Sequence, residues 1–198
     1  TATAPADVNR GVVSARVNGF TESEFRNGVT DAPICAGLVT ASTLTGYFGA
    51  LTFGHDGVTI SYAYKSGMSL VGVSSVLSVI IKMTDGTAPI ATGHHTGSDF
   101  VFVINGAQTA AASIVSLGGG YYRVSSIPTV ITSNNTGVIK YYNNSPRTFT
   151  VTAYDLRPTS QANLPYQRVN TATDYDTAGF PHYLAFNGTN TTYVTPSI

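Results

Sequence analysis

Short apolar runs recur along the chain, and most of them are bounded by Gly, Asn, Asp or Pro. Most runs are short enough to be single strands and are rich in Val, Ile, Thr, Tyr and Phe, which favour β-structure. The runs are GVVSARVNGF, PICAGLVTASTL, GYFGALTFG, GVTISYAYKSG, SLVGVSSVLSVIIKM, DFVFVINGA, ASIVSLGGGYYRVSSI, TGVIKYYNN and RTFTVTAYDL. Many short strands separated by turn residues predict an all-β fold, either a sandwich or a barrel.

Two of these runs alternate between two sets of positions, as expected for a strand with one face in the core. In residues 58–65, the alternation predicts a core face of Val58, Ile60, Tyr62 and Tyr64 opposite a half-wet face of Thr59, Ser61, Ala63 and Lys65. In residues 148–154, it predicts a core face of Phe149, Val151 and Ala153 opposite a half-wet face of Thr148, Thr150, Thr152 and Tyr154.

Helical patterns are weak throughout. Thr21 and Glu24 have the spacing of a capping box, which predicts one helical turn at most. The segment GAQTAAASIV contains helix-favouring alanines flanked by β-branched residues, and we expect a loop that leads into a strand. Pro and small polar residues at 157–165 indicate a boundary. We therefore expect an N-terminal arm at 1–10, a β-sandwich at 11–158, and a linker with an extended C-terminal segment at 159–198.

Charge is scarce and balanced, with ten basic and ten acidic residues that together make up 10% of the chain. A neutral chain lacks the basic footprint that binds nucleic acid or anionic lipid. The low charge also protects poorly against self-association, so a homo-oligomer is expected. No secretory signal is evident, and the apolar stretch that ends at Lys82 is too short to span a bilayer, so no membrane insertion is expected.

Residues suited to catalysis or metal binding are scattered, and we expect no enzyme, no metal and no cofactor. Cys35 has apolar neighbours, which indicates buried packing. His94, His95 and Asp99 are close enough for a metal site, but an exposed polar turn explains them better. Glu22 and Glu24 are expected to be solvated surface.

Two Gly-rich or acidic segments allow an alternative assignment. The DYDTAG segment at 174–179 resembles half a calcium loop, although a plain turn explains it better. Gly118–Gly120 precede the predicted strand YYRVSSI rather than a helix, which favours a tight turn over a phosphate-binding loop.

Tyrosine and asparagine are abundant enough for sugar binding, which needs an aromatic face beside hydrogen-bonding groups. The candidate carbohydrate-binding residues are Tyr62, Tyr64, Tyr121, Tyr122, Arg123, Asn134 and Asn135, with Tyr141 and Tyr142 as further candidates. The alternative for each tyrosine is packing in the core or at an interface, because half of the side chains on a strand face inward.

Three strings over residues 45–158 carry a resemblance to a known family. They are VTISYAYKSG, SLGGGYYRVSSIPTV and FTVTAYDLRP, in matching order and spacing. This pattern resembles the carbohydrate-binding-module-like jelly-roll domain of tailed-phage structural proteins. The resemblance implies a jelly-roll sandwich located in a virion, as a tail fibre, head fibre or capsid decoration.

The C-terminal string NLPYQRVNTATDYDTAGFPHYLAFNGTN is similar to the lead-in of a concanavalin-like lectin domain in such proteins. Ala185 and Asn187 replace the Arg and Asp that are usual there, so no ligand role carries over. The string is either the beginning of a longer protein's next domain or an extended arm. In the second case we expect its aromatics to be packed as subunit or virion contacts, namely Tyr166, Tyr175, Phe180, Tyr183 and Phe186.

These expectations converge on a non-enzymatic structural protein of a tailed-phage virion. Its partners would be capsid or tail proteins, other copies of the chain in a trimer or dimer, and a host-surface glycan. A free carbohydrate-binding module, once attached to a glycan-active enzyme, is the alternative, and a hydrolase using Asp99 or His94 is the third.

Overall fold

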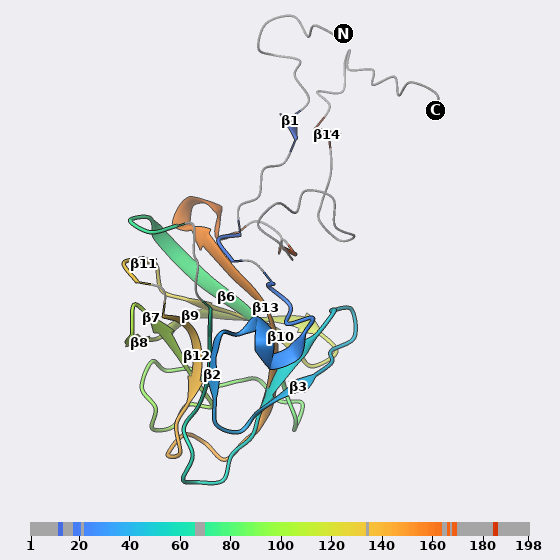
Figure 1. The fold of residues 1–198 in the computed structure, drawn as a ribbon, viewed down its shortest axis with the longest axis vertical. Coiled ribbons are helices and arrows are strands. Elements are labelled where there is room, and N and C mark those ends of the chain that lie inside the picture. Colours follow the sequence, from blue (N-terminus) through green and yellow to red (C-terminus); the bar gives the residue numbers. More distant parts are fainter. Residues whose placement is uncertain are drawn as a thin grey trace, which may run out of the picture.

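The computed structural model describes residues 12–13, 18–20, 22–65, 70–133, 135–163, 166, 168–169 and 184–185. Within these ranges the chain forms two antiparallel β-sheets that pack together, which confirms the predicted β-sandwich (Figure 1). The helical turns among the described residues are two short 3-10 helices, η1 (Gly28–Asp31) and η2 (Thr159–Gln161).

The larger sheet has the strand order β3-β4-β13-β6-β10-β9, and β11 also pairs with β6. Its strands are β3 (Val39–Ser42), β4 (Ala50–Phe53), β6 (Ser74–Met83), β9 (Ala111–Gly118), β10 (Tyr121–Ser126), β11 (Thr129–Val130) and β13 (Phe149–Pro158). The two longest strands, β6 and β13, lie side by side in its centre.

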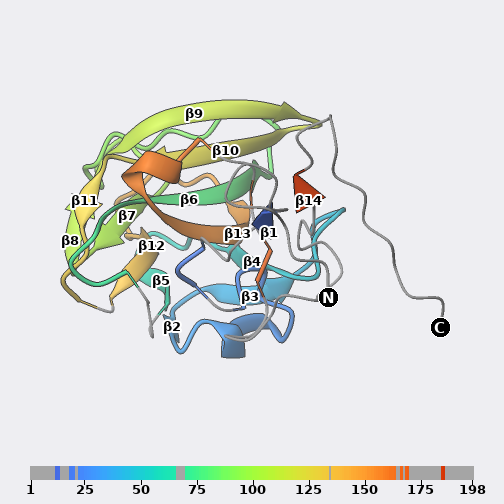
Figure 2. The same cartoon turned by 90° about the horizontal axis from the view of Figure 1, so that it is seen from above.

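The smaller sheet has the strand order β2-β5-β12-β7-β8. Its strands are β2 (Ile34–Ala36), β5 (Ser61–Lys65), β7 (Val101–Ile104), β8 (Ala107–Thr109) and β12 (Thr136–Lys140). Seen from above, the labelled strands of this sheet lie to the left of β6, β13 and β4 of the larger sheet (Figure 2).

A separate two-stranded pair connects two segments that are far apart in the sequence. Strand β1 (Val12–Val13) pairs antiparallel with β14 (Leu184–Ala185). The C-terminal segment therefore pairs with an N-terminal segment of the same chain at these residues.

The core fills the space between the two sheets with side chains from both. Phe53 and Phe149 of the larger sheet stack at a ring distance of 4.9 Å, and Phe149 contacts Phe100, which precedes β7, at 5.5 Å. Phe102 and Val138 of the smaller sheet belong to the same buried cluster. Alternation places these residues inward, and the residues between them on the same strands face outward.

Strand β5 corrects the predicted core face of residues 58–65. Ser61, Ala63 and Lys65 are the buried residues, and Tyr62 and Tyr64 lie on the outer face. Val58 is 77% exposed and Ile60 is 39% exposed. The prediction took the larger side chains as the core set, but an alternating pattern fixes only which residues share a face. The small Ser61 and Ala63 face inward, and the Lys65 ammonium is satisfied by backbone carbonyls of Glu22 and Asp31.

Strand β13 confirms half of its predicted pattern. Phe149, Val151 and Ala153 are buried as expected, but Thr152 and Tyr154 are also fully buried. The register against β6 shifts between Thr152 and Asp155, and Ala153 has a φ of 54°. A bulge of this kind changes the direction of the following side chains, so Tyr154 turns inward.

The segment GAQTAAASIV at 106–115 corrects a second expectation, because β8 and the first part of β9 occupy most of it, where a loop leading into a strand was expected. Gly118, Gly119 and Gly120 all have positive φ and connect β9 to β10. The tight turn predicted for the three glycines is therefore confirmed.

Candidate functional site

Two of the candidate tyrosines stand together on the outer face of the smaller sheet. Tyr62 and Tyr64 of β5 stack with a ring distance of 5.1 Å and an interplanar angle of 17°. Beneath and beside them, Val101, Val103 and Ile139 form a small buried cluster that is separate from the main core. Strand register explains this grouping, because Ile139 pairs with Tyr62 and also with Val101.

Gly137 of β12 leaves room for Tyr64 to lie across the sheet. The two residues are direct partners in the register. A Cβ atom at Gly137 would lie 2.2 Å from the Ala63 carbonyl oxygen and 3.0 Å from Cδ1 of the Tyr64 ring. The glycine therefore permits the close approach that holds this ring against the strand.

Tyr141 is the third aromatic residue at this surface and packs against the same cluster. Gln108 of β8 donates from Nε2 to the Tyr141 hydroxyl at 3.1 Å, and the His95 ring lies 5.3 Å from the Tyr141 ring. Asn144 accepts a hydrogen bond from the Tyr141 backbone and donates to the carbonyls of His95 and Ser98. We call Tyr62, Tyr64, Tyr141 and Gln108 the tyrosine platform.

The surroundings of Tyr64 in the tyrosine platform keep its hydroxyl group neutral. Burial, together with the neighbouring Tyr141 and Tyr62, raises the pKa of Tyr64 to about 12. A neutral phenol both donates and accepts hydrogen bonds. The platform thus combines aromatic faces, hydroxyl groups and one amide on an apolar base, which suits the hydroxyls and apolar face of a sugar ring.

The other candidate residues do not join this platform. Tyr121 lies on the larger sheet, where its ring is 4.8 Å from the Lys82 ammonium. Tyr122, the next residue, packs against the main core, because neighbouring residues on a strand face opposite ways. Arg123 donates to the Ala162 carbonyl and lies 3.9 Å from the Asp155 carboxylate.

The remaining candidates are separate from both groups. Asn135 is exposed, and its carbonyl accepts a bond from the Gly106 amide. Tyr142 is 48% exposed. Asn134 lies outside the described residues.

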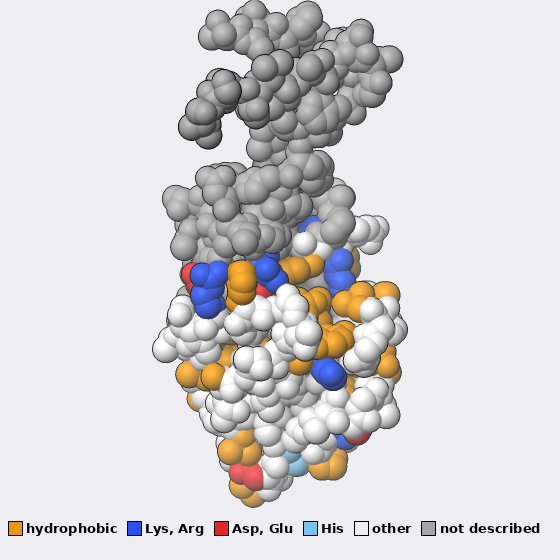
Figure 3. Space-filling model, turned by 90° about the vertical axis from the view of Figure 1, so that its right-hand side faces the viewer, with side chains coloured by type: hydrophobic (Ala, Val, Ile, Leu, Met, Phe, Trp, Pro, Cys, Tyr) orange, Lys and Arg blue, Asp and Glu red, His pale blue; other side chains and the backbone are white. Residues whose placement is uncertain are grey.

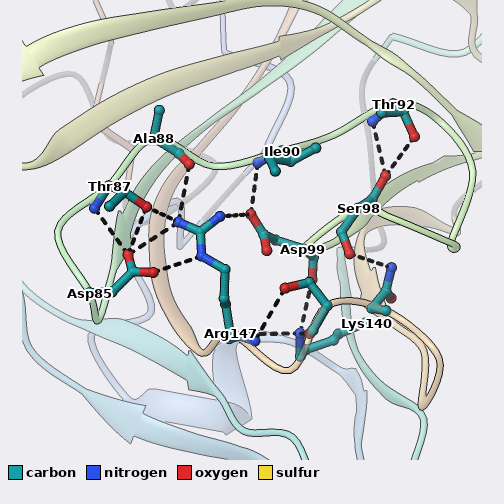
Figure 4. A network of polar contacts seen from close by, with 11 residues as sticks. Asp85, Thr87, Ala88, Ile90, Thr92, Ser98, Asp99, Lys140 and Arg147 are labelled. Carbon is teal, nitrogen blue, oxygen red and sulfur yellow. Dashed lines mark hydrogen bonds and ion pairs between the residues drawn. The ribbon is translucent and has the colours of Figure 1, made fainter.

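Figure 4 shows a polar network around Arg147 and Asp99. Asn144 connects this network to the tyrosine platform, because it donates to the Ser98 carbonyl and accepts from the Tyr141 amide. Arg147 lies between two carboxylates, with Nε 2.7 Å from Asp85 Oδ2 and Nη1 2.8 Å from Asp99 Oδ2. The Ile90 amide also donates to Asp99 Oδ2 at 2.7 Å. Arg147 holds the pKa of the Asp85 carboxyl well below its usual range. This geometry ties the 85–99 segment to the start of β13.

Lys140 stabilises the same end of the sandwich through hydrogen bonds from its buried side chain. Its buried ammonium donates to the carbonyls of Asp99, Ser145 and Arg147 at 3.1, 2.7 and 2.9 Å. Burial lowers the pKa of Lys140 to about 8. The ammonium satisfies three backbone acceptors that would otherwise be buried without donors.

Asp99 is therefore not part of an exposed turn, which corrects that expectation for this residue. It is fully buried, whereas His94 is exposed and His95 is half-buried. The two histidine rings stack at 4.2 Å. Within the described ranges, no group of three or more His, Cys, Asp or Glu side chains is placed to hold a metal ion.

Glu24 corrects the expectation of a solvated surface. It is 1% exposed, and its carboxylate binds Arg168 Nε at 2.7 Å and the Phe48 amide at 2.9 Å. The partner Arg168 is 144 positions away in the sequence, so no local signal could reveal the pairing.

Cys35 of β2 is half-buried rather than fully buried and packs against the main core. Burial raises the pKa of its thiol.

In the C-terminal segment, the Tyr166 hydroxyl lies 2.7 Å from Ser23 Oγ, so this aromatic is packed. Tyr175, Phe180, Tyr183, Phe186 and the DYDTAG segment lie outside the described residues.

Sequence reasoning missed Gln108 and His95 as neighbours of Tyr141. Both belong to segments that are remote from Tyr141 in sequence, and only the pairing of β7 with β8 and β12 brings Gln108 to this surface. Tyr47, whose ring lies beside that of Tyr121, and its chain neighbour Phe48 were also not singled out, because they lie in a loop before β4 with no distinctive motif.

The geometry of the tyrosine platform and its surroundings is the basis for assigning a function to this chain. Among the described residues, no helix is long and apolar enough to cross a membrane. No protein-family model matches the chain, and no curated protein shows significant sequence similarity to it.

Proposed function

We propose that this protein is a non-enzymatic carbohydrate-binding sandwich that serves as a structural part of a tailed-phage virion and contacts host-surface glycans. The observation that carries the binding role is the tyrosine platform, where three tyrosines and Gln108 gather on one outer sheet face. The virion setting rests on the resemblance of three strings between residues 45 and 158 to phage structural proteins.

The order of the strands supports a jelly-roll assignment. Strands β4, β13, β6 and β10 are neighbours in one sheet, and β5, β12, β7 and β8 are neighbours in the other. Along the chain, β4, β5, β6 and β7 alternate between the two sheets, and β10, β12 and β13 alternate again. Two four-stranded sheets connected in this way are the arrangement of a jelly roll.

The platform favours a neutral sugar chain bound along an open surface. A pyranose ring would lie against the Tyr62 and Tyr64 rings, and its hydroxyls would bond the tyrosine hydroxyls and Gln108. Tyr64 and Tyr141 are held in place by Gly137 and Gln108 before any ligand arrives. Such preorganisation reduces the entropic cost of binding.

A glycan array followed by titration of the best neutral oligosaccharide tests the binding role. Tyr64→Ala should weaken binding at least about tenfold, which corresponds to about 1.4 kcal/mol. Tyr142→Ala is the matched control, since Tyr142 is exposed and is not among the tyrosines packed on Val101, Val103 and Ile139. Equal weakening by both variants, or no glycan bound, would contradict the proposal.

Assembly and location are tested separately. The low charge supports a dimer or trimer, and the edge strand β9 supports it further, because Ile114 and Val115 are exposed on a strand without charged residues. Light scattering with and without phage capsids or tails measures both properties. A monomer that binds glycan but ignores particles would favour the free carbohydrate-binding module instead.

A further inference from the structure

A second aromatic surface lies on the larger sheet, next to the glycine turn between β9 and β10. The Tyr47 and Tyr121 rings are 6.4 Å apart with an interplanar angle of 35°. Together with Thr45 and Leu117 they line a shallow cavity of about 180 Å³. This volume suits part of a small ring rather than a whole drug-sized molecule.

Lys82 adds a positive charge at the edge of this cavity. It pairs with Tyr121 across β6 and β10, and its ammonium lies 4.8 Å from the centre of the Tyr121 ring. Among the described residues, no carboxylate lies within ion-pair distance of Lys82. The cation is therefore held over the aromatic ring and remains available to an anion.

Phe48 extends the same surface on the side of Tyr47. It is 40% exposed, and its ring lies between two guanidinium groups, with Arg26 Cζ at 4.4 Å and Arg168 Cζ at 4.2 Å from the ring centre. Glu24 neutralises Arg168 through its buried ion pair. Burial raises the pKa of Tyr47, Glu24 and Tyr121 raise it in the same direction, and Arg168 opposes the increase.

The charge on this surface differs from that of the whole chain. Three cations, Arg26, Lys82 and Arg168, are set against one carboxylate, Glu24, which leaves a balance of +2 on a chain whose formal net charge is zero. On the face shown in Figure 3, basic side chains lie beside exposed hydrophobic ones, and few acidic side chains are visible. We call Arg26, Tyr47, Phe48, Lys82, Tyr121 and Arg168 the cationic aromatic surface.

We propose that the cationic aromatic surface binds an acidic saccharide, a sugar chain that carries carboxylate groups. The apolar face of one sugar ring lies against Tyr121 and Tyr47, and a carboxylate of the chain lies at the Lys82 ammonium. A balance of +2 is too small for the many phosphate contacts that hold nucleic acid, so charge and shape favour the saccharide. This site is on the opposite sheet from the tyrosine platform and goes beyond its proposed role.

Calorimetric titration of the Tyr64→Ala protein, in which neutral sugar binding at the tyrosine platform is weakened, with a trimer of galacturonic acid and with the neutral trimer of galactose tests this assignment. The acidic trimer should bind at least tenfold more tightly to the cationic aromatic surface, and its affinity should fall as salt rises and screens the charge. Lys82→Gln should weaken acidic binding at least fivefold, whereas Lys82→Arg retains the charge and most of the affinity. Tyr121→Ala should weaken it at least tenfold.

The controls distinguish loss of binding at the cationic aromatic surface from unfolding of the protein and from loss of binding at the tyrosine platform. Each variant is checked by its thermal unfolding midpoint, which Lys82→Gln should leave unchanged because the side chain is half-exposed. Equal affinity for the two trimers, an unchanged affinity in Lys82→Gln, or equally tight binding of oligothymidylate would overturn the proposal. The tyrosine platform is tested by Tyr64→Ala on another sheet, so each proposal can fail without the other.

Discussion

Tyr154 shows at the residue scale how one backbone irregularity defines the core. The bulge at Ala153 turns this tyrosine into the sandwich, where it is fully buried and packs edge-on against Phe25 at 4.8 Å. Its hydroxyl donates to the Ala63 carbonyl at 3.2 Å, which links β13 to β5 across the core. Burial raises the Tyr154 pKa well above its usual value, so the phenol stays a donor.

Tyr154→Phe should lower the free energy of unfolding by about 1 kcal/mol, because it removes a hydrogen bond while keeping the ring. Urea denaturation measures this difference. Tyr142→Phe provides the control at an exposed position and should leave the urea midpoint unchanged. A Tyr154→Phe protein as stable as the original would show that the Ala63 contact does not contribute.

Asp56 contributes to the loss of stability at acid pH. Its carboxylate accepts bonds from the Thr59 hydroxyl and from the amides of Val58 and Thr59, which lowers its pKa to about 2. The folded-state pKa is thus below the unfolded value of about 4, so the stabilisation is present above that value. It is lost as the pH falls through about 2.

Stability should therefore fall less steeply between pH 4 and pH 2 in Asp56→Asn than in the original protein. Thermal unfolding at several pH values measures the two slopes, and their difference isolates this carboxylate from Asp85, whose pKa is also lowered. Parallel slopes for the two proteins would contradict the account.

At the scale of elements, the sequence predicted where the strands lie. It predicted only in part which side chains of each strand face the core. Turn residues and β-branched runs indicated where β6, β10 and β13 lie, because these properties are local. The facing of β5 was predicted wrongly, since burial of Ser61, Ala63 and Lys65 depends on the opposite sheet and on distant carbonyls. The same limit hid the pairing of Glu24 with Arg168.

Arg147→Gln should destabilise the protein by about 2 kcal/mol, because it leaves the buried Asp99 carboxylate without its cation. This is below the usual cost for fully buried pairs, since Arg147 is partly exposed. Urea denaturation measures the loss, and Arg26→Gln is the control at an arginine that stacks on Phe48. Equal effects of the two variants would show that Asp99 does not depend on Arg147.

At the scale of the whole molecule, the sandwich presents two aromatic surfaces of different charge on its two outer faces. The sequence identified Tyr62, Tyr64 and Tyr141 of the tyrosine platform as candidate binding residues. It did not predict that they lie together, because their grouping depends on the strand order β5-β12-β7-β8. Tyr121 belongs to the cationic aromatic surface instead, because its strand lies in the other sheet. Sequence supplied the residue types, and the topology of the two sheets decided which of them meet.

The most direct test of the carbohydrate-binding role is the affinity of a host-surface polysaccharide for the original protein, Tyr64→Ala and Tyr142→Ala, measured by titration under one set of conditions. The account predicts binding that weakens at least about tenfold in Tyr64→Ala and stays unchanged in Tyr142→Ala. Undiminished binding by a folded Tyr64→Ala protein would contradict it.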